Sequence, residues 1–118
     1  FLSATFKGQK GKKNKIKEKF ISFKEKKSKS QPSKIKTGGS TFKNPVDQTQ
    51  KKVWELIDDS VDKNIKFGDA IISEKHSNFF INKKNASFED MNNLINFVKY
   101  NVKKKTGINL DLEIQILK

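Results

Sequence analysis

The sequence contains no cysteine, which excludes disulfide bonds and thiolate metal sites and fits a reducing compartment. His76 is the single histidine, so a zinc site is not expected and no metal is predicted. No apolar run approaches the roughly 18 residues that cross a membrane. The opening FLSATF, residues 1–6, is too short for a signal-peptide core. We therefore expect a soluble, cytoplasmic protein with no membrane partner.

Arginine is also missing, and the 26 basic residues are all lysines, which with 13 acidic residues give a net charge of +13. Residues 1–36 hold 13 lysines and 2 acids, whereas residues 37–118 hold 13 lysines and 11 acids. Guanidinium groups are the usual readers of guanine edges and the favoured bidentate phosphate ligands. A solvated lysine-rich helix is therefore favoured over a nucleic-acid partner. A nucleic-acid or polyanion-binding module without catalytic activity remains the alternative function.

The 118 residues leave room for one modest domain and not for a large complete enzyme. The opening FLSATF alternates like a strand that would pair with earlier neighbours, so we expect the chain to be the tail of something longer. Residues 14–29 predict a helix with one apolar stripe that can pack against a domain. Residues 30–40, with one proline and two glycines, predict a linker or domain boundary.

The second half predicts an α+β unit with a small sheet. Residues 48–59 have the periodicity of a helix, and KFGDAIIS and NFFIN are short β-rich runs. A longer helix is expected from Ser87, which with Asp90 forms a capping pair, to Lys105, followed by a left-handed exit at Gly107. Residues 108–117 alternate apolar and polar side chains, which predicts a last strand with its acids on one face.

Several segments occur in an order and spacing that resemble one family. They are GGSTFKNP, WELIDDS, FGDAIISEKHSNFFIN, NASFED and GINLDLEIQIL. Over roughly residues 30–117 they resemble the C-terminal part of UDP-N-acetylmuramate dehydrogenases, also called UDP-N-acetylenolpyruvoylglucosamine reductases. The resemblance implies that residues 1–30 are the end of an FAD-binding domain, with a strand and a basic helix. It further implies a substrate-binding domain at 31–107 and a final strand at 108–118 that returns to the FAD-binding region.

The resemblance also implies a reaction. Enzymes of this family use FAD, with NADPH as the hydride donor, to convert UDP-N-acetylglucosamine enolpyruvate to UDP-N-acetylmuramate in peptidoglycan precursor synthesis. The family's glycine-rich flavin-binding segments, and the arginine that acts with its catalytic glutamate, lie upstream of Phe1. The partners expected for this chain are thus a UDP-sugar and a separate FAD-binding domain, and the fragment alone is not expected to be active.

The same resemblance assigns candidate site residues. Ser40 corresponds to the proton donor and Glu113 to the glutamate that stabilises the enol. Lys43 and Asn44 correspond to a region that contacts the UDP diphosphate, and His76 to a substrate-side position. Taken alone, the pattern around Ser40 also fits a turn serine, and His76 also fits a hydrogen-bonded linker between two strands.

Overall fold

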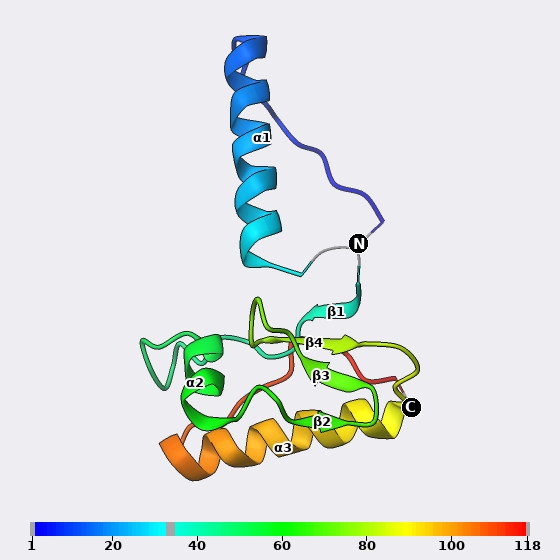
Figure 1. Ribbon diagram of the computed structural model, residues 1–118. Helices are drawn as coiled ribbons and strands as arrows, with labels where there is room; N and C mark the ends of the chain where they lie inside the picture. The colour runs from blue at the N-terminus through cyan, green and yellow to red at the C-terminus, as the bar shows by residue number, and fades with distance from the viewer. Residues whose placement is uncertain (1, 33–34, 118) are drawn as a thin grey trace.

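The computed structural model describes residues 2–32 and 35–117. This part of the chain forms three helices and four strands, and three of the strands follow one another between α2 and α3 (Figure 1). In order they are α1 (Lys13–Ser30), β1 (Lys36–Ser40), α2 (Val53–Ser60), β2 (Lys66–Phe67), β3 (Ala70–Ile72), β4 (Phe79–Asn82) and α3 (Phe88–Thr106). The α+β fold class expected from the sequence is confirmed.

The four strands form one antiparallel sheet in the order β1-β4-β3-β2. β3 and β4 form its centre, where Ile71 pairs with Ile81. α3 runs along one face of the sheet and contacts β2 and β3, and α2 packs against α3 (Figure 1). The result is two layers, with a sheet on one side and a helix on the other.

The core lies between these two layers. α3 contributes apolar side chains at three- and four-residue steps, which place them on one face of the helix. The two central strands contribute Ala70, Ile72 and Phe80 from the facing side of the sheet. The helical side chains buried here are Val53, Leu56 and Ile57 of α2 and Leu94, Ile95, Val98 and Val102 of α3.

α3 is capped at the two residues that the sequence predicts. Ser87 Oγ accepts a hydrogen bond from the backbone N–H of Asp90 at 3.1 Å, and Asp90 Oδ2 accepts one from the N–H of Ser87 at 2.8 Å. This reciprocal pair satisfies two amides at the start of the helix. Gly107 ends the helix with a φ of 75°, and its N–H donates to the carbonyl of Lys103. The predicted cap and exit are confirmed.

The predicted linker at residues 30–40 is partly wrong, because residues 36–40 form the edge strand β1. Lys36 pairs with Asn82 and Thr37 with Ile81, after which the register shifts before Ser40 pairs with Phe79. Gly39 lies inside this irregular stretch with a φ of 87°, a conformation that glycine adopts without strain. The strand forms because β4 supplies a hydrogen-bonding partner, which local composition does not reveal.

Neither terminal strand forms as predicted. Residues 2–12 are exposed and contain no strand, and residues 108–117 contain only one isolated bridge, between Leu112 and Phe42. Side-chain burial in the C-terminal segment still alternates from 108 to 117, and Leu110 is fully buried. Alternation thus predicted which side chains face the core. A strand also needs a second segment to pair with along its length, and no described residue supplies one.

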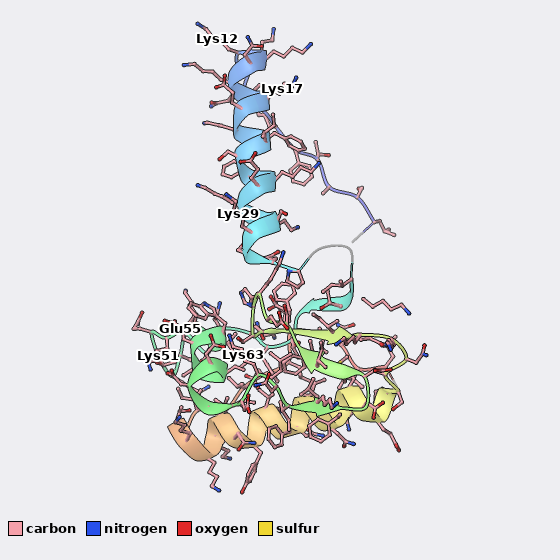
Figure 2. All side chains as sticks on the ribbon, in the orientation of Figure 1. Lys12, Lys17, Lys29, Lys51, Glu55 and Lys63 are labelled. Atoms are coloured by element: carbon pink, nitrogen blue, oxygen red, sulfur yellow. The ribbon has the colours of Figure 1, made fainter. Side chains whose placement is uncertain are left out.

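α1 stands apart from the two layers (Figure 1). The predicted helix is confirmed, but none of its described residues is buried. Phe20 and Phe23 of the predicted apolar stripe are 66% and 65% exposed, so the stripe has no partner among the described residues. Lys12, Lys17 and Lys29 mark the length of the helix and project into solvent (Figure 2). No helix in the described part of the chain is long and apolar enough to cross a membrane.

Candidate functional site

The segment from Ser40 to Lys43 leaves the end of β1 and crosses the domain between two neighbours. Ser40 is half-buried, whereas Thr41 and Phe42 are buried. On one side, the N–H of Thr41 donates to the carbonyl of Asn78 at 2.8 Å. On the other side, the N–H of Lys43 donates to the carbonyl of Asp111 at 2.9 Å. The segment is therefore fixed by backbone hydrogen bonds from both directions.

Glu113 reaches this segment through the C-terminal stretch. Its N–H donates to the carbonyl of Thr41 at 2.9 Å, next to the bridge between Phe42 and Leu112. In the sequence, Ser40 lies near the start of the folded domain and Glu113 near its end. The hydrogen bond joins Glu113 to Thr41, the residue that directly follows Ser40. The Glu113 side chain is exposed to solvent. The predicted proton donor and enol-stabilising glutamate are thus neighbours at the backbone level.

Asn44 has a structural role in this fold. Its Oδ1 accepts a hydrogen bond from the N–H of Val53, the first residue of α2, at 3.0 Å. A side-chain acceptor is needed there because Lys52, which precedes the helix, carries only donors. The carboxamide oxygen of Asn44 is therefore occupied by the hydrogen bond from α2. A ligand would bind to Asn44 through its NH₂ group, which carries the two donors. Lys43 beside it is exposed.

His76 lies in a different place, at the rim of a cavity of about 380 Å³. Its ring meets Phe79 edge-on, with ring centroids 4.9 Å apart, and Trp54 at 6.5 Å. Its Nδ1 accepts a hydrogen bond from the N–H of Asn78 at 3.3 Å. Burial lowers the pKa of His76 below its ordinary value of 6.5. The neutral imidazole is therefore favoured. The cavity is lined by Ser30, Trp54, Asp58, Lys63, Lys75, His76 and Ser77.

The charges around this cavity are unequal. Lys63, which lies beside α2 (Figure 2), pairs with Asp58 at 2.8 Å, and the hydroxyl of Ser77 also donates to Asp58. Among the described residues, the ammonium of Lys75 donates to the backbone carbonyl of Ser28, at 3.3 Å, and pairs with no carboxylate. Because the one lining carboxylate is matched by one lysine, the second lysine leaves the cavity net positive. Its chemistry suits an anionic ligand.

Asn78 connects the two regions and was missed by the reasoning from sequence. Its side chain is almost fully buried, its Oδ1 accepts from the N–H of Phe42 at 2.9 Å, and its Nδ2 donates to the carbonyl of Phe42 at 2.8 Å. The available signal was a polar residue directly before the apolar start of β4. Such a residue, once buried, needs partners for all of its polar atoms.

The five predicted site residues do not line one cavity in the described part of the chain. Ser40, Lys43 and Glu113 gather around the bridge at Phe42, Asn44 turns to α2, and His76 opens into the cavity beside Trp54. Among the described residues, no cluster of three or more histidine, aspartate, glutamate or cysteine side chains is placed to hold a metal ion.

Comparisons with known proteins agree on one family. Residues 31–117 match the family model for the C-terminal domain of UDP-N-acetylenolpyruvoylglucosamine reductase. A protein of that name from Pelagibacter ubique is 65% identical over 118 residues, which are all of this chain and 39% of that protein. One from Rickettsia typhi is 43% identical over 114 residues, 97% of this chain and 38% of that protein. The chain thus spans about 39% of the length of the first of these relatives.

A solved structure gives the same answer for the fold. The crystal structure of UDP-N-acetylenolpyruvylglucosamine reductase from Thermus caldophilus superposes with a TM-score of 0.70 at 29% identity, covering 91% of this chain and 36% of that one. The matched fold, the family model over most of the chain and the match of the whole chain to 39% of the Pelagibacter ubique protein lead to one conclusion. This chain belongs to the UDP-N-acetylenolpyruvoylglucosamine reductase family and carries its C-terminal domain.

Proposed function

We propose that this chain is the substrate-binding part of an FAD-dependent, NADPH-using reductase that converts UDP-N-acetylglucosamine enolpyruvate to UDP-N-acetylmuramate in peptidoglycan precursor synthesis. Membership of the family supports the proposal. The observation that carries it is the hydrogen bond from Glu113 N–H to the carbonyl of Thr41, because it brings the two candidate catalytic residues, Ser40 and Glu113, to neighbouring positions.

The flavin contacts belong to another part of such an enzyme. Anionic cofactors commonly bind where a glycine-rich loop leads into a helix. α2 and α3 begin after Lys52 and Ser87, with no glycine-rich loop before them. The loop before α1 contains Gly8 and Gly11, but it lacks the spacing of a phosphate-binding loop. The described residues therefore offer no site of this type for the diphosphate of FAD, and we assign no FAD contact to this chain.

Within the proposed reaction, the groups of this chain act on the substrate. The hydride for one carbon of the enolpyruvyl double bond would come from the FAD-binding part of the enzyme. Ser40 gives a proton to the neighbouring carbon, and the double bond becomes the single bond of a lactyl ether. Negative charge develops on the adjacent carboxyl group in between, and Glu113 acts there together with the arginine that the family resemblance places upstream of Phe1. A serine hydroxyl is a weak acid, so its position must be fixed against the accepting carbon.

The anionic part of the substrate has two candidate sets of donors. Lys43 and the NH₂ group of Asn44 follow directly after the candidate catalytic segment. The net positive cavity beside His76 offers Lys75 and the ring itself. We propose that Lys43 and Asn44 contact the diphosphate, and that His76 contacts the substrate from the cavity side.

A chimera tests the proposal. This chain would replace the matching C-terminal segment of the Pelagibacter ubique relative, to which it is 65% identical along its whole length. We expect the chimera to retain flavin, to be reduced by NADPH and to be reoxidised by UDP-N-acetylglucosamine enolpyruvate, followed by flavin absorbance in stopped flow. The control is the same relative cut before the segment, which should lose reoxidation. A chimera that is reduced normally but is never reoxidised by this substrate would contradict the proposal.

The lysines of α1 favour one alternative, a polyanion-binding module. They are exposed along the whole helix (Figure 2). Binding of duplex DNA to the isolated chain at rising salt separates the two functions, since each neutralised phosphate releases a counterion. Tight binding with a steep loss at higher salt supports the alternative. Absence of binding near physiological salt removes it.

A further inference from the structure

We propose that Asn78 is a positioning residue for the reaction, because its carboxamide fixes the segment that carries Ser40. The inference rests on the function proposed above. Asn78 is only 4% exposed, and it touches neither Ser40 nor Glu113 through a hydrogen bond of its side chain. It acts through Phe42, whose two backbone polar groups both bond to the Asn78 side chain.

The geometry replaces a missing strand partner. Regular pairing between β1 and β4 is interrupted between Thr37 and Ser40 and ends at the pair of Ser40 with Phe79. Because the two strands are antiparallel, the residue opposite Thr41 is Asn78, which precedes the start of β4. In the described part of the chain the Asn78 carbonyl accepts a hydrogen bond from the N–H of Thr41. The Asn78 side chain then completes the pairing. It presents one acceptor and one donor to Phe42, at 2.9 and 2.8 Å, as a backbone amide pair would.

The other edge of the same segment holds the C-terminal stretch. Thr41 accepts from Glu113 at its carbonyl, and Lys43 donates to Asp111 from its N–H. The polar groups of successive residues therefore alternate between Asn78 on one side and residues 111–113 on the other. The ring of Phe42 also packs edge-on against Phe80, with centroids 5.8 Å apart. A displacement of Phe42 is thus transmitted along the chain to Ser40, two residues earlier, and across the bridge to Glu113.

This arrangement has a catalytic consequence. Proton transfer requires the hydroxyl of Ser40 to lie within hydrogen-bond reach of the accepting carbon, and small misplacements of reacting groups reduce rates strongly. Loss of the Asn78 carboxamide frees the backbone of Phe42 and loosens both candidate catalytic residues together. Flavin reduction by NADPH needs neither residue. Asn78 should therefore affect one half-reaction and not the other.

The experiment uses the chimera described above, with Asn78→Asp and Asn78→Ala. The aspartate keeps the size and the acceptor but places an oxygen against the carbonyl of Phe42, and the alanine removes both hydrogen bonds without adding charge. In each variant we expect flavin reduction to stay within about twofold of the parent. Reoxidation by the enolpyruvyl sugar should slow by about 10-fold or more, given the sensitivity of rates to misplaced groups.

Asn82 provides a matched control at the other end of β4. Its carboxamide also brackets one residue, accepting from the N–H of Ala86 at 2.9 Å and donating to the carbonyl of Ala86 at 3.2 Å. That contact lies at the approach to α3, and in the described part of the chain no hydrogen bond of the Asn82 side chain reaches residues 40–43 or 111–113. Asn82→Asp and Asn82→Ala should lower the unfolding midpoint as the Asn78 variants do, while the ratio of the two half-reaction rates stays that of the parent.

The outcomes separate the inference from the function on which it rests. A parent chimera that cannot be reoxidised defeats the proposed function, whatever the variants do. An active parent whose folded Asn78 variants keep the parent ratio, or shift it no more than the Asn82 variants, overturns the role of Asn78. Amide hydrogen exchange of Phe42 in the 118-residue chain gives a readout without activity. Exchange should accelerate in Asn78→Ala, which removes the acceptor of the Phe42 N–H, relative to Asn82→Ala, and an unchanged rate counts against the inference.

Discussion

The N–H of Glu113 donates a hydrogen bond of 2.9 Å to the carbonyl of Thr41, and Thr41 directly follows Ser40 in the chain. This contact, together with the bond from Lys43 N–H to the carbonyl of Asp111, joins the last described segment of the domain to the residues that follow β1. Because the acid and the hydroxyl are carried by segments that are held together, their roles can be tested separately by changes confined to their side chains.

Ser40→Ala separates the two half-reactions. The first, reduction of the flavin by NADPH, transfers a hydride between cofactors and needs no proton donor at the sugar carbon. The second needs one. In the chimera we expect reduction to be unchanged and reoxidation to slow by about 10²-fold or more, the usual contribution of a positioned general acid. Substrate affinity should change little, because the hydroxyl acts mainly in the transition state.

Stopped-flow absorbance of the flavin follows both steps of the Ser40→Ala protein on one sample. Ser73→Ala is a suitable control, because Ser73 is also a serine beside a strand end and its hydroxyl only accepts from the N–H of Lys75. Normal reoxidation in Ser40→Ala would show that Ser40 has only a structural place at the end of β1.

Glu113→Gln tests the enol-stabilising role. The amide keeps the size of the side chain and leaves the backbone bond to Thr41 in place, but it removes the charge. We expect reoxidation to slow by about 10²-fold, because the amide no longer pairs with the arginine that the family resemblance places upstream of Phe1, and a group that holds a charge-stabilising donor in place contributes on that scale. Asp111→Asn is the matched control, since Asp111 lies two residues earlier on the same alternating face and is also exposed. Equal losses in both variants would contradict a specific role for Glu113.

The sequence predicts best where the determinants are local. Ser87 and Asp90 lie within one helical turn, and the apolar positions of α3 recur at fixed steps, so the helix and its cap could be predicted. β1 could not, because KTGGS has no apolar pattern and becomes a strand only beside β4. Bringing Ser40 to Glu113 was predicted through the family resemblance alone. Asn78 remained unpredicted, since a buried asparagine is recognisable only when the backbone that it satisfies is known.

Gly68→Ala should be more damaging than Gly107→Ala. Both glycines have positive φ, 52° and 75°, which costs an ordinary residue about 1–2 kcal/mol. A Cβ at Gly107 meets open space, whereas one at Gly68 would lie 2.5 Å from Oδ2 of Asp90, the carboxylate that caps α3. We expect Gly68→Ala to cost about 1–3 kcal/mol beyond the backbone strain, as overpacking commonly does.

Urea unfolding of the two glycine variants of the 118-residue chain measures this difference. The Gly107→Ala protein serves as the control for backbone strain alone. Equal losses would mean that Asp90 moves away from the new methyl group without loss of the cap. Adding Ser87→Ala to each variant then shows whether the cap was already broken in Gly68→Ala.

His76 predicts a dependence of stability on pH. Burial lowers its folded pKa below 6.5, while the unfolded chain keeps a value near 6.5. As the pH falls through 6.5, the unfolded state therefore binds a proton before the folded state does, and the free energy of unfolding decreases until the folded pKa is reached. Well above pH 6.5, His76 is neutral in both states, and the free energy of unfolding has its full value. The facing charges, Asp58 and Lys63, act in opposite directions on this pKa.

Unfolding by denaturant at a series of pH values checks the role of His76 against His76→Gln. In the variant, the free energy of unfolding should no longer decrease just below pH 6.5. It should still decrease at more acidic pH, where carboxylates such as Asp59, whose pKa is lowered by Lys51, become protonated. Identical profiles for the two proteins would mean that His76 is solvated in the folded state.

The outer margins of the sheet bear on self-association. β2 has two residues, and β1 is interrupted by the shifted register around Gly39. A regular, exposed edge presents a row of unpaired amides and carbonyls on which another chain can add a strand, which is how many β proteins begin to aggregate. Here the edge strand β2 is too short to act as such a template, and the edge strand β1 is too irregular. The conformationally permissive backbone around Gly39, next to Ser40, can therefore be retained without exposing an edge strand to which another chain could add.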